Sequence, residues 1–160
     1  MEIRTASARD AAALAALERL CFPAAEAAAE EEIVARTAHY GNHFWLLLDG
    51  GQLIAFVDGM VTDRPDLTDD LYAEAALHDE RGAWQMIFGV NTHPDFRRRG
   101  YAALLLERAI ADARAQGRKG LVLTCKEALV HYYAKFGFRS EGLSRSAHGG
   151  AVWYQMRLTF

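Results

Sequence analysis

Runs of apolar residues with two different spacings divide this chain into helices and strands. Leucines and alanines recur every three or four residues through 11–20 and through 102–113, which places them on one face of a helix. Other short runs are continuously apolar, as is typical of buried strands. Strands are therefore predicted at residues 2–5, 44–48, 53–60, 84–92 and 121–125, from Phe138 onward, and at 151–158.

Turn signals and one long connection complete the predicted order of elements. Asp49-Gly50-Gly51 joins two strands as a hairpin, and the alanine- and glutamate-rich residues 24–38 predict a second helix. Residues 62–82 form the one long connection, with a helix expected within 69–77, and long ordered insertions are often functional. The pattern predicts an α/β (α+β) fold, a mixed and mostly antiparallel sheet of about six or seven strands flanked by helices.

Composition limits the class of protein. With 160 residues, 51% of them hydrophobic, the chain can build one sizeable core, so we expect a single domain over residues 1–160. A formal net charge of −3 argues against a general nucleic-acid binder. We expect no membrane contact, because no apolar run reaches the roughly 18 residues of a span. Cys21 and Cys125 lack metal-ligand spacing, so no metal is expected, and two reduced thiols fit a cytoplasmic protein.

The strongest chemical signal lies between the strand at 84–92 and the helix that follows. Phe96-Arg97-Arg98-Arg99-Gly100-Tyr101-Ala102 places a basic turn at a helix start. Unpaired backbone N–H groups and the helix dipole favour an anion there, and Gly100 lets the backbone come close to it. A turn with no ligand is the simpler alternative. A dinucleotide fold is disfavoured because the chain has no Gly-x-Gly-x-x-Gly.

A second segment follows the strand at 121–125. It predicts a short helix that contains Tyr132 and Tyr133, ends at Gly137 and leads into a strand from Phe138. Together, Arg97-x-x-Gly100-x-Ala102 and Tyr133-x-x-Phe136-Gly137-Phe138 resemble two motifs of the GNAT acyltransferase family, about thirty residues apart and in the family's order.

This resemblance implies a cosubstrate and a catalytic acid. Members of the family bind acetyl-coenzyme A, and the tyrosine that matches Tyr133 acts as general acid towards the departing sulfur. The pantetheine arm would pair with the backbone of the strand before the basic turn, and the diphosphate would lie in the turn. The implied cofactor-binding residues are Val90, Asn91, Thr92, Arg97, Arg98, Arg99, Gly100, Tyr101, Ala102 and Ala103.

The chain is most similar to the arylalkylamine (serotonin) N-acetyltransferase group of this family. The similarity lies in Leu17-Glu18-Arg19-Leu20-Cys21-Phe22-Pro23 and in residues 125–130. It departs from the group where vertebrate members carry two histidines that help to deprotonate the amine, because Met86 and Phe88 stand at these positions. Lys126 stands where many members of the family carry an asparagine.

The general base is therefore not supplied by the expected residues. Glu26 is one candidate, because insect arylalkylamine acetyltransferases use a glutamate from this neighbourhood. A surface helix carboxylate is the simpler interpretation of Glu26, and an ordered water is another route for the proton. His93 and His148 are interpreted as surface or loop residues.

The sequence thus predicts an acetyl-coenzyme A-dependent N-acetyltransferase that acts on a primary amine of a small molecule, with an arylalkylamine as one candidate. The acidic connection at 62–82 would attract a cationic amine and form a wall of the acceptor site. A polyamine, an amino acid or a protein N-terminus are alternative acceptors, and a coenzyme A-binding sensor without turnover is an alternative class. Many members of this family are dimers, so a homodimer is compatible with the sequence.

Overall fold

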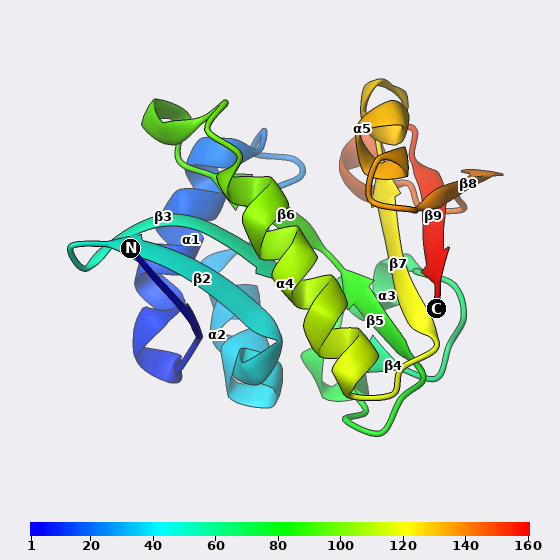
Figure 1. The fold of residues 1–160 in the computed structure, drawn as a ribbon, viewed down its shortest axis with the longest axis horizontal. Coiled ribbons are helices and arrows are strands. Elements are labelled where there is room, and N and C mark those ends of the chain that lie inside the picture. Colours follow the sequence, from blue (N-terminus) through cyan, green and yellow to red (C-terminus); the bar gives the residue numbers. More distant parts are fainter.

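The fold consists of two adjoining sheets with helices on both faces (Figure 1), and the computed structural model describes residues 1–160. The strands are β1 (Glu2–Thr5), β2 (Phe44–Asp49), β3 (Gln52–Asp58), β4 (Val61–Thr62), β5 (Trp84–Ile87), β6 (Gly89–Thr92), β7 (Gly120–Cys125), β8 (Arg139–Leu143) and β9 (Tyr154–Thr159). The helices are α1 (Ala11–Cys21), α2 (Glu30–Tyr40), α3 (Asp69–Ala73), α4 (Tyr101–Ala115) and α5 (Val130–Ala134). None of the helices combines the length and apolar character that crossing a bilayer requires.

Strand pairing confirms a mixed, mostly antiparallel arrangement. The first sheet has the order β1-β2-β3-β6 and the second the order β4-β5-β7-β9-β8. Only β5 and β7 pair in parallel. If the short β4 is set aside and β5 and β6 are taken as the one strand predicted at 84–92, seven strands remain, as the sequence indicates.

The predicted strand at 84–92 is interrupted at Phe88, and its two halves belong to different sheets. β5 pairs with β7 from Trp84↔Gly120 to Ile87↔Leu123. At Phe88 the amide donates to Asp58 O at 2.7 Å, and β6 continues along β3 instead. β6 and β7 therefore diverge towards the end of the molecule where α5 lies (Figure 1).

Alternating side chains on β2 and β3 build a core on each side of the first sheet. Phe44, Leu46 and Phe56 pack on one face against residues of α1 and α2. Trp45, Leu47, Val57 and their neighbours pack on the other face against α4. Figure 1 shows this division, with α4 on one side of the sheet and α1 and α2 on the other.

The prediction of a helix over 24–38 is wrong at its start, because α2 begins at Glu30. The amides of Glu26 and Ala27 both donate to Pro23 O and form a turn. The Ala28 amide then donates to Glu18 Oε2 at 2.9 Å, which ties the segment back to α1. This contact with a buried carboxylate outweighs the helix propensity of the alanines, and it leaves residues 22–28 beside the β6 strand.

Burial along α4 predicts unequal effects of two neighbouring leucines on stability. Leu106→Ala, at a fully buried position, is expected to lower the free energy of unfolding by about 2–5 kcal/mol, because it leaves a cavity under the helix. Leu104→Ala is the matched control, since Leu104 is 44% exposed in the same helix. Urea unfolding followed by circular dichroism measures both, and equal losses would contradict this account of the core.

Candidate active site

A cavity of about 240 Å³ lies where β6 and β7 separate. Its walls come from the end of α1, the segment that follows it, α3, the β5–β6 strand, the end of β7, α5 and the loop before β9. The lining residues that the site chemistry uses are Glu18, Glu26, Tyr72, Lys126, Tyr133 and His148. The second sheet supplies one side of this cavity and the first sheet the other.

One edge of β6 faces this opening without a strand partner. β6 ends the order of the first sheet, so β3 occupies only one of its two edges. Val90 lines the cavity, while Asn91 is buried. The Thr92 carbonyl accepts from Cys21 Sγ and from Arg97 Nε, each at 3.3 Å. Such an edge can receive an extended ligand through backbone hydrogen bonds.

The basic turn has the backbone of an anion-binding loop. Arg98 has φ 63° and Gly100 has φ 79°, and this second residue directly precedes α4. Because the first hydrogen bond into the helix runs from Leu104 N to Gly100 O at 3.0 Å, the amides before Leu104 lie in the turn whose N–H groups lack helical partners. The side chains of Arg97, Arg98 and Arg99 are exposed at the same end. Alternating φ signs and a helix N-terminus both favour a phosphate.

Tyr133 projects from α5 into the cavity and is 7% exposed. Its ring lies edge-on to Tyr132, with ring centres 5.1 Å apart, and to Phe138. Burial raises the pKa of Tyr133, and no hydrogen bond offsets this effect. The hydroxyl therefore stays protonated at neutral pH and can act as a donor. Tyr132 is half-buried and packs against Phe136.

Glu26 lies on the cavity wall, in the turn that replaces the start of the predicted helix. Its side chain is 10% exposed, and Oε2 is 3.0 Å from Lys126 Nζ. Lys126 in turn lies over the Trp153 ring, 5.8 Å from its centre. The ion pair with Lys126 thus occupies one oxygen of the Glu26 carboxylate. A surface position, the simpler interpretation of Glu26, does not match this burial.

A buried polar cluster lies beneath the cavity. Arg36 Nη1 lies 3.2 Å from Asp58 Oδ2, and Arg36 Nη2 donates to Tyr72 O at 3.0 Å. Burial raises the pKa of Asp58 to about 7, although the adjacent guanidinium lowers it. Burial also raises the pKa of Glu18. Arg36 pairs with Asp58 and not with Glu18, and one oxygen of each carboxylate, Glu18 Oε1 and Asp58 Oδ1, has no hydrogen-bond partner.

A row of aromatic rings forms part of the cavity wall. Tyr72 lies 4.7 Å from Phe88 and 5.1 Å from His148, measured between ring centres. Trp153 follows, 6.2 Å from His148. Tyr72 belongs to the connection 62–82, which therefore borders the cavity as expected. Phe88 lines the cavity but Met86 is fully buried in the core, so the two positions that carry histidines in related enzymes differ in access.

His148 is the residue of this site that the sequence interpretation missed. It lies in a loop, as expected, but its ring is on the cavity wall rather than at the surface. No local pattern marks it, because its contacts come from residues 72 and 26, far away in the chain. His93, by contrast, accepts from the Asp95 amide in the turn after β6 and does not line the cavity.

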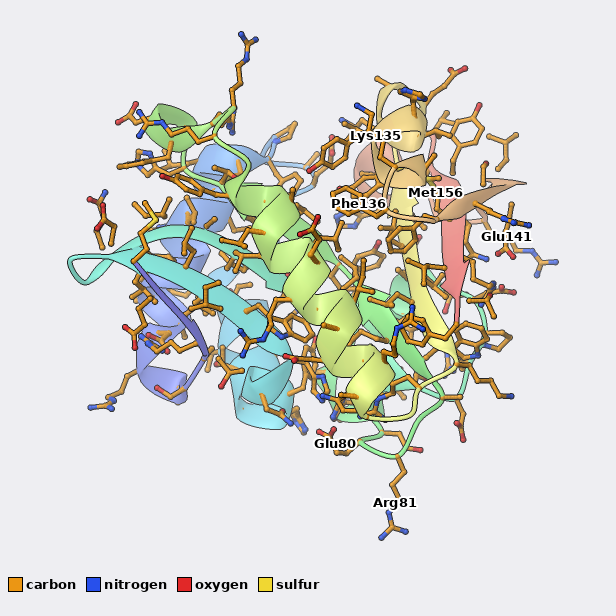
Figure 2. The ribbon with its side chains drawn as sticks, viewed as in Figure 1. Glu80, Arg81, Lys135, Phe136, Glu141 and Met156 are labelled. Carbon is orange, nitrogen blue, oxygen red and sulfur yellow. The ribbon has the colours of Figure 1, made fainter.

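A cluster of two histidines and a glutamate lies away from the cavity. His43 Nε2 is 2.8 Å from Glu80 Oε2, and His78 Nε2 is 3.2 Å from Glu80 Oε1. His78 Nδ1 accepts from the Val61 amide, so the Nε2 of the neutral ring carries a proton towards Glu80. Arg118 also pairs with Glu80 at 3.0 Å. Figure 2 shows Glu80 at the end of the molecule opposite Lys135 and Phe136, which follow α5, so this cluster is separate from the cavity.

Comparisons with known proteins agree with the geometry. Residues 11–138 match the Acetyltransferase (GNAT) family. A serotonin N-acetyltransferase from Mesocricetus auratus is 30% identical over 108 residues, which are 67% of this chain and 51% of that protein. The match therefore spans about half the length of this curated relative.

Solved structures show the same fold. The GphF GNAT-like decarboxylase in complex with isobutyryl-CoA superimposes with a TM-score of 0.85 at 23% identity, covering 99% of both chains. The loading GNATL domain of CurA from Lyngbya majuscula has a TM-score of 0.84 at 18% identity, covering 99% of this chain and 96% of that one. The family match covers most of the chain and includes both the basic turn and the Tyr133 helix, and the chain belongs to the acetyltransferase (GNAT) family.

Proposed function

We propose that this protein is an acetyl-coenzyme A-dependent N-acetyltransferase that acts on the primary amine of a small molecule, with an arylalkylamine as the expected class. The observation that carries the proposal is the combination of one cavity with an anion-binding turn that follows it along the chain. The unpartnered edge of β6 and the side chain of Tyr133 border the cavity between the two sheets, and β6 leads directly into the amide-rich start of α4. The similarity to a serotonin N-acetyltransferase supports both the activity and the acceptor class.

The cosubstrate would follow the backbone from the turn into the cavity. Its diphosphate would bind the amides from Arg98 to Ala103, and its pantetheine arm would pair with Val90, Asn91 and Thr92 as an added strand. The exposed guanidinium groups of the turn supply a positive field for the phosphates. The thioester would then lie in the cavity near Tyr133.

In the proposed reaction the neutral amine attacks the thioester carbon directly. A backbone N–H of β6 would stabilise the oxyanion, and the loss of such a donor typically costs about 2.7–4 kcal/mol. As the carbon–sulfur bond breaks, Tyr133 gives its proton to the thiolate. A phenol carries its proton at neutral pH and can donate it to the departing sulfur, and solvent restores this proton after release.

The aromatic part of the wall suits an aromatic amine. Four rings, those of Tyr72, Phe88, His148 and Trp153, lie next to one another on the lining and can pack against the ring of an acceptor. Glu26 also lines the cavity, and its carboxylate already holds the Lys126 ammonium at 3.0 Å, so this wall accommodates a cationic group. Arylalkylamines combine these two properties.

A thiol-release assay with a panel of amines tests the proposal. Free coenzyme A is expected to form from acetyl-coenzyme A with tryptamine and phenethylamine, and less with spermidine, lysine or a short peptide. Tyr133→Phe is expected to bind coenzyme A normally and to lose at least about tenfold in turnover, because a positioned acid contributes about 100- to 10,000-fold. Calorimetry measures the binding.

The panel also separates the alternatives. Preference for spermidine, lysine or the peptide would overturn the arylalkylamine assignment and keep the transferase. Binding of coenzyme A without turnover of any amine would favour a sensor. Unchanged turnover of Tyr133→Phe would remove this residue from the mechanism.

Substitutions in the basic turn test whether the backbone or the side chains hold the diphosphate. Gly100→Val is expected to weaken coenzyme A binding more than Arg98→Ala does, because Val resists a φ of 79° and would displace the amides. Gly117→Val is the matched control, with φ 78° and no atom within 4 Å of an added Cβ, at the other end of α4. It should disturb the backbone equally and leave binding intact.

Titration calorimetry gives the three dissociation constants. The backbone cradle would be refuted by a larger loss in Arg98→Ala than in Gly100→Val. Equal losses in Gly100→Val and Gly117→Val would show that the effect is one of general stability.

A further inference from the structure

The proposed reaction needs a group that removes a proton from the amine, and several residues near the cavity are unsuited to it. Met86 and Phe88 cannot accept a proton. The Glu26 carboxylate is held by Lys126 at 3.0 Å. Glu18 accepts the Ala28 amide through Oε2, and its other oxygen is sealed from solvent.

His148 has the geometry of an oriented proton acceptor. Its Nε2 lies 2.7 Å from the backbone oxygen of Glu26. A carbonyl only accepts, so Nε2 must carry the hydrogen, and the lone pair of the neutral ring is then on Nδ1. Nδ1 makes no hydrogen bond and is not among the side-chain atoms sealed from solvent. The ring lines the same cavity as Tyr133.

The surrounding structure fixes this ring. It stacks on Tyr72 with an angle of 13° between the ring planes, and its backbone oxygen accepts from Trp153 Nε1 at 2.9 Å. Two residues earlier, the Ser146 hydroxyl is bonded to Asp69 Oδ1, and Asp69 Oδ2 accepts from the Ala147 amide at 3.1 Å. These contacts hold the loop against α3 and the cavity wall.

Gly149 explains how the loop reaches Glu26. A Cβ at this position would lie 2.6 Å from Glu26 Cγ and 3.0 Å from Ala25 O. Only a residue without a side chain allows so close an approach, and its φ of 63° also favours glycine. The short distance from His148 Nε2 to Glu26 O depends on this packing.

We propose that His148 is the general base of the acetyl transfer, an inference that rests on the proposed function. Nδ1 takes a proton from the amine nitrogen as that nitrogen forms its bond to the thioester carbon. The carbon–sulfur bond breaks, and the thiolate receives the proton of Tyr133. The products are the acetamide and the free thiol, and solvent then takes the proton from His148 and reprotonates Tyr133.

Charged and titratable groups lie near this ring on several elements. Glu26 contacts the ring through its backbone and carries a carboxylate nearby, and Glu18 faces His148 from α1. Asp69 holds the same loop from α3, and Tyr72 covers the ring face. Two cations lie nearby: Lys126, which pairs with Glu26, and Arg36, which lines the same cavity and pairs with Asp58.

His148→Gln tests the proposal, because the glutamine amide can still donate to Glu26 O but has no titratable lone pair. With the best amine of the panel at pH 7.5, turnover is expected to fall at least about tenfold while the dissociation constant of coenzyme A stays within about twofold. The exposed His39→Gln is the matched control and should retain wild-type turnover. His148→Ala is expected to recover activity when imidazole is added.

The pH dependence gives a readout that a purely structural role would not change. The ratio of wild-type to His148→Gln turnover is expected to rise with pH, because only the neutral imidazole accepts a proton. Full activity of the Gln variant, or a low activity with a ratio independent of pH and no recovery with imidazole, would overturn the proposal. An inactive wild-type protein would instead contradict the proposed function itself.

Discussion

The separation of β6 from β7 is the constraint on which the candidate site depends. Parallel pairing between β5 and β7 ends at Ile87↔Leu123, and the chain then follows β3. Backbone groups that would otherwise complete a continuous sheet are left at an edge, and such groups need a partner. In the proposed complex the pantetheine arm provides it. The same separation makes room for Tyr133 and for the aromatic wall, so one backbone departure serves both substrates.

The buried polar cluster beneath the cavity lowers the stability of the fold. Arg36, Asp58 and Glu18 are all buried, and several of their polar atoms have no partner in the protein. Buried ion pairs contribute little net stability, because desolvation offsets their attraction. These groups lie under the cavity, and the Asp58 carbonyl accepts from the Phe88 amide at the break between β5 and β6. The loss of stability is therefore associated with the candidate site rather than with the hydrophobic core.

The features that could be predicted from sequence are those with a local cause. The hairpin at Gly50-Gly51, the face of α4 and the segment before β8 each follow from residues close together in the chain, and the structure has all of them. The two motifs also placed the basic turn and Tyr133 correctly with respect to the strands. The predicted start of α2 was wrong because the Ala28 amide donates to Glu18, and helix propensity takes no account of such a tertiary contact.

The break at Phe88 and the place of His148 have the same explanation at longer range. A run of apolar residues does not reveal which strands will lie beside it, so 84–92 reads as one element. His148 acquires its orientation from Tyr72, Trp153 and Glu26, which are brought together only when the two sheets are assembled. Site residues that depend on tertiary contacts therefore leave little trace in the local sequence.

The proposed cosubstrate and acceptor halves of the site differ in whether main-chain or side-chain groups form them. In the proposed complex the cosubstrate half would use main-chain groups of β6 and of the turn before α4, which depend on the backbone conformation, including the positive φ of Gly100, more than on particular side chains. The acceptor half would be lined by side chains from segments far apart in the chain: residues 22–28, α3, the break at Phe88, and the loop that carries His148 and Trp153. Changes of acceptor can thus accumulate in exposed connections without disturbing the binding of the acyl donor. Substitutions confined to one loop could therefore change the acceptor of the enzyme during evolution.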